Sequence, residues 1–116
     1  MASFTGAITL VGYGAARGTG SGSFTVPSGE FFDGVFSYDI SSAGPVVSGG
    51  SVDLKINITA GGSNIAIAGG IRTNESGFNV ALSDHGFVPL KLGPGTYTIT
   101  PTISAVTWAI SGHFIK

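Results

Sequence analysis

Two histidines are the side chains of this sequence best suited to acid–base chemistry near neutral pH. His85 directly follows Ser83 and Asp84, and His113 lies near the end of the sequence. A hydrolytic triad needs a serine, a histidine and a carboxylate that converge from separate positions. Because Ser83, Asp84 and His85 are adjacent, they cannot converge, and the pattern predicts a polar turn with no catalytic residue. A pH-sensitive or metal contact of a histidine across a subunit interface is the alternative.

The carboxylates are spread singly, and they do not predict a metal or glycosidase site. Glu30 and Asp33 are close in sequence, but their spacing puts them on opposite faces of a strand. Two histidines without cysteine are too few for zinc, and no looped cluster of the calcium-binding kind is present. We therefore expect a protein that is not an enzyme and has no metal and no cofactor. The remaining carboxylates are Asp39, Asp53, Glu75 and Asp84.

Gly18–Gly22 is a glycine-rich segment that superficially resembles a phosphate-binding loop. A dinucleotide fingerprint needs a strand before it and a helix after it, and a P-loop needs Gly-Lys-Ser/Thr. Neither context is present, because Ser23–Val26 continues as an expected strand. The segment is predicted to be a flexible surface loop without a bound cofactor.

Aromatic side chains are the remaining candidates for a binding site. Tyr97 and Trp108 are in phase with apolar neighbours, so we expect them in the core. Phe31 and Phe32 break the alternation, and one of the two rings must point away from the face that the other occupies. Such a break suggests association with other chains. The aromatic residues that could bind a ligand at the surface are Tyr13, Phe32, Tyr38 and Phe87.

Charge and composition exclude several classes of protein. The 116 residues include five basic and six acidic ones, a charged fraction of 9%, whereas an average soluble domain has about 25%. No basic stripe is present to bind phosphates, so we expect no nucleic-acid partner. The absence of cysteine excludes disulfides, and we expect no signal peptide and no membrane span. A hydrophobic fraction of 42% indicates a folded chain rather than a disordered one.

Period-two alternation of apolar and polar residues is the strongest structural signal. Ser51–Ala60 alternates throughout, which predicts a strand with one buried and one solvent-exposed face. Similar alternation predicts strands over 78–82, 97–103 and 106–110. Weaker strand candidates are Ala7–Tyr13, Ser23–Val26, Phe31–Ile40, Ile65–Ile71 and Phe87–Leu92.

Glycine- and proline-rich turns separate these segments, and helix signals are nearly absent. Ala60-Gly61-Gly62-Ser63 stands between two apolar runs and predicts a hairpin. Short strands with regular turns and no helix are typical of an antiparallel sandwich or barrel. We predict an all-β fold, a jelly-roll-like antiparallel β-sandwich of eight or nine short strands, in a single domain over 1–116.

Two stretches carry a resemblance to known proteins. Leu92–Ile99 contains a Pro-Gly-x-Tyr strand opening that resembles those of β-sandwich binding modules and trimeric jelly-roll domains. Trp108–Lys116 looks like the last central strand of such a domain. Together with the glycine-rich, cysteine-free composition, these stretches are similar to small bacteriophage virion proteins of the capsid decoration (cement) or fibre-knob type. The resemblance transfers no functional residue.

This resemblance and the low charge imply a structural virion protein. We expect a homo-oligomer, most simply a homotrimer, that docks on the major capsid protein of a phage as a decoration protein. Low charge reduces the desolvation cost of several interfaces at once. Met1–Thr5 is apolar enough to add to a neighbour's sheet edge. The alternative is a carbohydrate-binding module or a receptor-binding tail-fibre domain, with glycan stacked on the surface aromatics.

Overall fold

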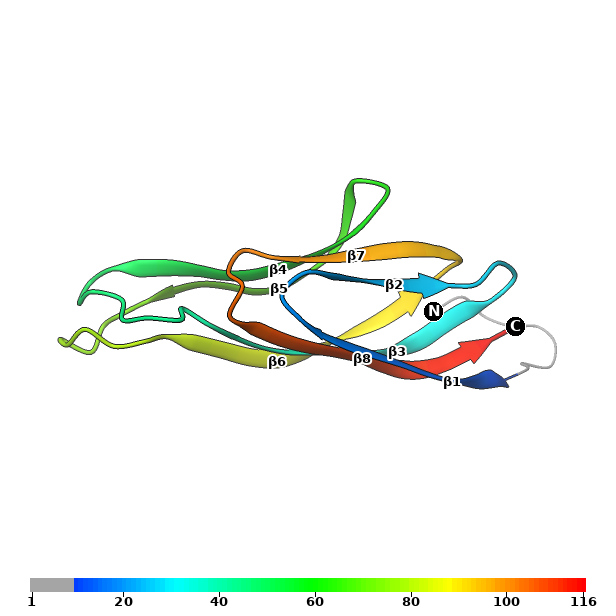
Figure 1. Ribbon diagram of the computed structural model, residues 1–116, viewed down its shortest axis with the longest axis horizontal. Coiled ribbons are helices and arrows are strands. Elements are labelled where there is room, and N and C mark those ends of the chain that lie inside the picture. The colour runs from blue at the N-terminus through cyan, green and yellow to red at the C-terminus, as the bar shows by residue number, and fades with distance from the viewer. Residues whose placement is uncertain (1–9) are drawn as a thin grey trace.

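The computed structural model describes residues 10–116, which form eight antiparallel strands in two sheets (Figure 1). The strands are β1 (Leu10–Thr19), β2 (Gly22–Val26), β3 (Phe31–Ser41), β4 (Ser51–Ala60), β5 (Ser63–Thr73), β6 (Ser83–Leu92), β7 (Gly95–Pro101) and β8 (Val106–Ile115). The predicted docking of Met1–Thr5 on a neighbour lies outside the described residues.

The first four strands pair with the last four in reverse order. β1 pairs with β8, β2 with β7, β3 with β6 and β4 with β5. Further pairing of β3 with β8 and of β4 with β7 gives the sheets β1-β8-β3-β6 and β2-β7-β4-β5. This order is that of an eight-stranded jelly roll. It confirms the predicted all-β antiparallel sandwich, which is elongated, with extents of 57 × 22 × 21 Å.

The chain turns back on itself at the hairpin between β4 and β5. Gly61 and Gly62 have φ angles of +57° and +85°, and two central residues with positive φ define the type I′ turn that suits the twist of paired strands. The predicted hairpin at Ala60-Gly61-Gly62-Ser63 is confirmed.

The inward faces of both sheets form one apolar core. The strand predicted over Ser51–Ala60 is confirmed with the same bounds, and its residues Leu54, Ile56 and Ile58 are fully buried. Tyr97 and Trp108 also lie in the core, as predicted. Alternation therefore assigns the buried face of β4, β7 and β8 correctly.

The glycine-rich segment Gly18–Gly22 makes room for Trp108 instead of forming the predicted flexible loop. Gly18 lies in β1 and Gly22 in β2, so the turn itself is short. A Cβ atom on Gly18 would lie 2.7 Å from Cζ2 of Trp108, and one on Gly22 would meet the same ring atom. The indole Nε1 of Trp108 donates a hydrogen bond of 2.9 Å to the carbonyl oxygen of Gly20. The loop prediction was wrong because these glycines are in contact with the core.

Three local predictions also differ from the structure. The strand predicted over 78–82 is a loop, apart from an isolated bridge between Val46 and Val80. His85 lies within β6 rather than in a turn, and Ile103 follows the end of β7. Alternation alone does not distinguish a strand from an extended loop that has no neighbouring strand to pair with.

Candidate interaction surfaces

The two histidines lie apart on the outer face of the β1-β8-β3-β6 sheet. His113 is next to Tyr13 and Asp33 in the strand register, and its ring meets that of Tyr13 edge-on with centroids 5.4 Å apart. His85 pairs with Asp39. Within residues 10–116, no group of three or more His, Asp or Glu side chains could hold a metal ion. This face therefore presents separate polar side chains and no convergent set.

The aromatic residues predicted to bind a ligand are not brought together. Tyr13 and Phe87 are 66% and 70% exposed, but they lie on β1 and β6, the opposite edges of one sheet. Three strand spacings separate these edges, about 14 Å. Tyr38 is half-buried and stacks on Phe36 from the core side. The four predicted residues do not make one platform.

Phe32 is a correction to the predicted set. It is 1% exposed, and its ring packs against Phe24 and Phe114 inside the sandwich, with centroid distances of 4.8 and 5.3 Å. Its neighbour Phe31 is 48% exposed. The sequence established that the two rings diverge, but not which one faces the core, because either choice leaves one phenylalanine outside.

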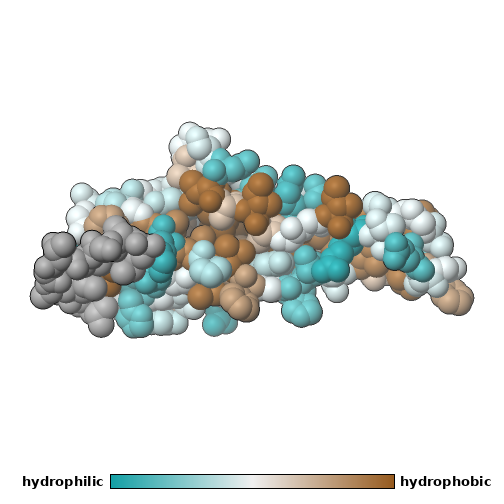
Figure 2. Space-filling view, turned by 180° about the vertical axis from the view of Figure 1, so that it is seen from behind, coloured by the Kyte–Doolittle hydropathy of each residue, from teal (hydrophilic) through white to brown (hydrophobic). Residues whose placement is uncertain are grey.

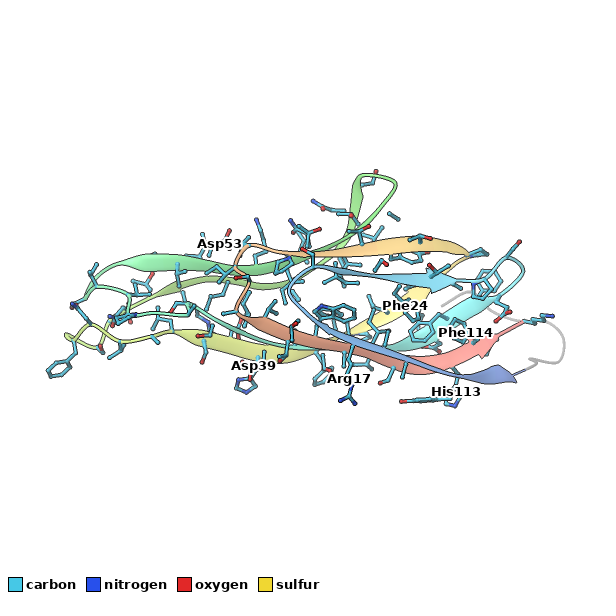
Figure 3. All side chains as sticks on the ribbon, in the orientation of Figure 1. Arg17, Phe24, Asp39, Asp53, His113 and Phe114 are labelled. Carbon is cyan, nitrogen blue, oxygen red and sulfur yellow. The ribbon has the colours of Figure 1, made fainter. Side chains whose placement is uncertain are left out.

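A shallow depression runs over the central strand β8, because its outward side chains are small. It has a volume of about 600 Å³, and Thr107 and Ala109 lie among its lining residues. Arg17 from β1 and Asp39 from β3 also line it, and Figure 3 shows these two side chains and His113 projecting from the same side of the molecule. The depression is wide and open, and Arg17 and Asp39 are the charged residues of its lining.

The edge strand β5 turns its small residues towards the core and its large apolar residues towards solvent, the opposite of the usual arrangement. Ala66, Ala68 and Gly70 alternate with the residues that face outwards, and Ala68 is buried in the core. The outward residues Ile65, Ile67 and Ile71 are 43%, 53% and 72% exposed, and we call them the isoleucine ridge. Figure 2 shows exposed apolar residues as separate brown groups among hydrophilic ones.

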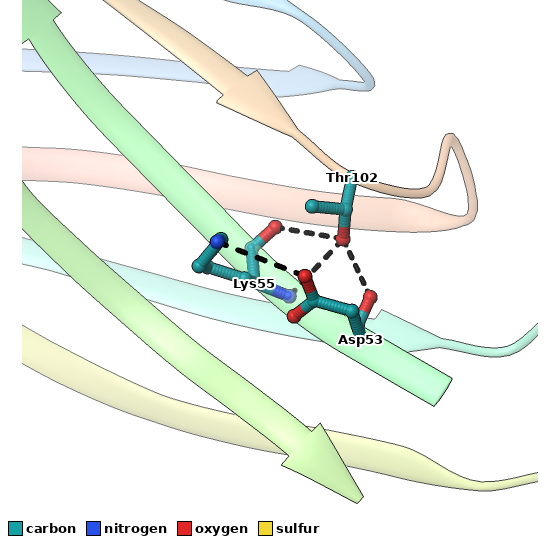
Figure 4. A network of polar contacts seen from close by, with 3 residues as sticks. All are labelled: Asp53, Lys55 and Thr102. Atoms are coloured by element: carbon teal, nitrogen blue, oxygen red, sulfur yellow. Dashed lines mark hydrogen bonds and ion pairs between the residues drawn. The ribbon is translucent and has the colours of Figure 1, made fainter. Parts of the chain in front are cut away.

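Polar residues of β4 lie beside the isoleucine ridge. In the strand register Asp53 is opposite Ile71, and Asn57 is opposite Ile67. The ammonium of Lys55 lies 3.7 Å from Oδ2 of Asp53, and Thr102 Oγ1 donates to the carbonyl oxygens of Asp53 and Lys55 (Figure 4). The hydrogen bonds of Thr102 join β4 to the segment after β7.

A second apolar feature stands at one end of the long axis. The segments 42–50 and 74–82, which we call the tip, join β3 to β4 and β5 to β6 (Figure 1). Phe78 and Val47 are 73% and 62% exposed there. Backbone hydrogen bonds of 2.8 and 3.2 Å connect Val46 and Val80 across the two segments.

Asn74 holds the tip in one conformation. Its side chain is buried, and Nδ2 donates to the carbonyl oxygens of Val46 and Phe78 over 2.7 and 2.6 Å. Its Oδ1 accepts from the backbone nitrogen and the hydroxyl of Ser76. The tip therefore presents Phe78 from a hydrogen-bonded loop. Sequence reasoning missed this role because the alternation around Phe78 resembles that of a strand.

Comparisons with known proteins give little further information. No protein-family model matches this chain, and no curated protein matches it. Among solved structures, it is similar to the Drosophila NLP core, a structure described for its insight into pentamer formation and histone binding. The TM-score is 0.41 at 13% identity, over 90% of this chain and 99% of that one. No helix among residues 10–116 is long and apolar enough to cross a membrane.

The comparison corrects the predicted function and partners. The solved structure that was found is described for pentamer formation and histone binding, and its description names neither a trimer nor a virion. Against this finding, the prediction of a homotrimeric phage capsid decoration protein without nucleic-acid partners is wrong, and its glycan-binding alternative gains no support. The resemblance to phage proteins and a location in a virion are not tested and stay predictions. A TM-score of 0.41 transfers neither pentamer nor histone binding to this chain.

Proposed function

We propose that this chain is a non-enzymatic structural domain that assembles with further copies of itself through exposed apolar side chains. The observation that carries this proposal is the orientation of β5, which turns the isoleucine ridge outwards at a sheet edge. A long apolar edge strand is a site where chains associate, and soluble monomers normally protect it with charges, proline or a covering segment. Arg72 is the one charged residue in β5.

The energetic argument rests on the isoleucines that are exposed. Complete burial of one isoleucine side chain is worth roughly 1.5–3 kcal/mol, and partly exposed residues can gain only the part still in water. Ile67 and Ile71 are more than half exposed, so a partner that covers both would remove substantial apolar area from water. Interfaces of stable complexes need such an apolar centre, surrounded by polar residues.

The surface charge favours association rather than opposing it. The formal net charge is −1, and the three ion pairs formed among residues 10–116 join partly exposed side chains. Two copies therefore repel each other weakly, and few charges lose water when surfaces meet. Threonines of β7 next to β4 add neutral polar groups to the same outer face.

The first test compares the mass of the protein in solution with that of an Ile67→Thr/Ile71→Thr double variant, by sedimentation velocity over a series of concentrations. Threonine keeps the β-branched shape but adds a hydroxyl, so the strand is retained while the apolar ridge is lost. We expect the wild-type chain to sediment above its monomer mass of 11.6 kDa and the double variant to shift towards it.

Thr98→Ser/Thr100→Ser is the matched control, because these residues face outwards on β7 of the same sheet. The control should sediment as the wild type does. A wild-type chain that is monomeric at every concentration contradicts the proposal, and so does a double variant that associates as strongly as the control.

A further inference from the structure

A slot opens between β5 and β6 on the side of the sandwich. It has a volume of about 350 Å³, and its lining includes Ile65, Val88, Lys91, Leu92, Gly93 and Tyr97. The Tyr97 hydroxyl donates to the carbonyl oxygen of Gly93 over 2.7 Å, so its polar group is already bonded and its ring contributes apolar surface. Lys91 is the charged residue in this lining, and its ammonium lies 3.0 Å from a carboxylate oxygen of Asp33.

The tip carries an exposed aromatic ring and an acidic residue, which complement the apolar lining of the slot and its lysine. Phe78 is largely exposed on a loop that Asn74 fixes, so placing its ring in a partner costs little conformational entropy. In the segments 42–50 and 74–82, Glu75 is the one charged residue. An apolar ring beside one acid therefore matches an apolar slot beside Lys91, whose ammonium has three donors and can bind Glu75 as well as Asp33.

The tip and the slot of one chain cannot meet. The molecule is 57 Å long, and Figure 1 places the tip at one end and the end of β6, which lines the slot, in the other half. A rigid sandwich cannot bring these regions together within one chain. Ile65 belongs both to the slot and to the isoleucine ridge, so the slot continues the surface that carries the proposed function.

We propose that Phe78 of one copy inserts into the slot of a second copy, with Glu75 next to Lys91. This inference rests on the proposed self-assembly and assigns its contact. The contact is heterologous, because the surface used on one copy differs from that used on the next. Repetition of it builds a closed ring if the rotation between copies closes, and a filament if it does not.

The first experiment compares Phe78→Ser with Phe87→Ser. Both rings are about equally exposed, at 73% and 70%. Phe87, however, lies on the outer face of the β1-β8-β3-β6 sheet and is not among the residues that line the slot. We expect Phe78→Ser to weaken self-association at least tenfold, which corresponds to about 1.4 kcal/mol, because the variant removes the aromatic anchor of the contact. Phe87→Ser should leave the dissociation constant unchanged, and both variants should keep the melting temperature of the wild type.

The second experiment uses the absence of cysteine in the chain. Phe78→Cys and Ile65→Cys proteins are mixed and oxidised, and the disulfide-linked species are separated by mass-tagged electrophoresis. Mixed dimers should exceed both homodimers and the product of a control pair, Phe78→Cys with Thr25→Cys on β2. Homodimers of Phe78→Cys in excess, or mixed dimers no more abundant than with the control pair, overturn the proposed contact.

The two proposals fail in different ways. If Phe78→Ser associates as the wild type does while Ile67→Thr/Ile71→Thr does not, the slot contact is wrong and self-assembly through the ridge stands. If the wild-type chain stays monomeric, the proposed function fails as well.

Discussion

Asn74 is the buried polar side chain of the described residues, and it links three parts of the tip. Its backbone nitrogen also donates to the carbonyl oxygen of Gly50, and its carbonyl oxygen accepts from the nitrogen of Gly49, each over 2.8 Å. A buried polar group with all its hydrogen bonds formed specifies one conformation. The backbone of Phe78 is therefore fixed by the Asn74 amide together with the Ser76 hydroxyl, which Asn74 itself binds.

Replacing Asn74 with alanine should destabilise the fold. The carbonyl oxygens of Val46 and Phe78 would each lose the shorter of their two hydrogen bonds, and each hydrogen bond lost costs about 0.5–1.5 kcal/mol. Urea denaturation should show this loss in the free energy of unfolding. Asn64→Ala, at an exposed position of β5, is the control. It should leave that free energy nearly unchanged, as surface substitutions usually do. Equal stability of the two variants would contradict the role assigned to Asn74.

At the scale of elements, three glycines lie in register across β1, β8 and β3. Gly14 pairs with Gly112, and Gly112 pairs with Gly34. A Cβ atom on Gly14 would meet the ring of Phe114, and one on Gly34 would lie 2.6 Å from the ring of Phe32. These glycines let the two aromatic rings lie directly on the backbone of the sheet.

Gly112→Ala tests this close packing. Its Cβ would meet the carbonyl oxygen of Asp33 and lie 2.5 Å from Cα of Gly34, and backbone atoms cannot move aside as a flexible side chain can. We expect a loss of about 1–3 kcal/mol in the free energy of unfolding, as for other overpacked cores. In Gly70→Ala a Cβ would meet no atom within 4 Å, so this variant should be neutral. A stable Gly112→Ala protein would show that the strands can separate locally.

The strands could be predicted where alternation and turn residues agree. The bounds of β4 and the Gly61-Gly62 hairpin followed from period-two alternation and turn chemistry. The orientation of β5 did not, because both of its faces consist of apolar or small residues and alternation alone ranks neither as the inner one. The face that turns inwards is decided by the space between the sheets, which depends on residues far away in sequence.

The candidate surfaces could be predicted only in part. Tyr13 and Phe87 are exposed as the sequence suggests, but Phe32 is buried, and the segment 78–82 of the tip forms no strand although alternation predicts one. The tip is held by hydrogen bonds between segments that are far apart in sequence, as from Asn74 to Val46. Such contacts leave no periodic signal in the sequence.

At the scale of the whole molecule, apolar contacts and low charge predict how association responds to salt. Sodium chloride screens charges within about 10 Å at 0.1 M, but it does not weaken apolar burial. We expect the dissociation constant to be nearly constant with added sodium chloride and to fall with ammonium sulfate, which strengthens apolar burial. Sedimentation equilibrium in both salts would measure this. A steep rise of the dissociation constant with sodium chloride would indicate charged contacts instead of the isoleucine ridge.

The most direct measurement of self-assembly is the mass of the wild-type chain in solution across a series of concentrations. The proposal that exposed apolar side chains join copies of this jelly roll predicts a mass above 11.6 kDa that rises with concentration to a plateau, or keeps rising if a filament forms. It also predicts that Ile67→Thr/Ile71→Thr lowers that mass while Thr98→Ser/Thr100→Ser does not. A mass of one chain at every concentration would contradict the account.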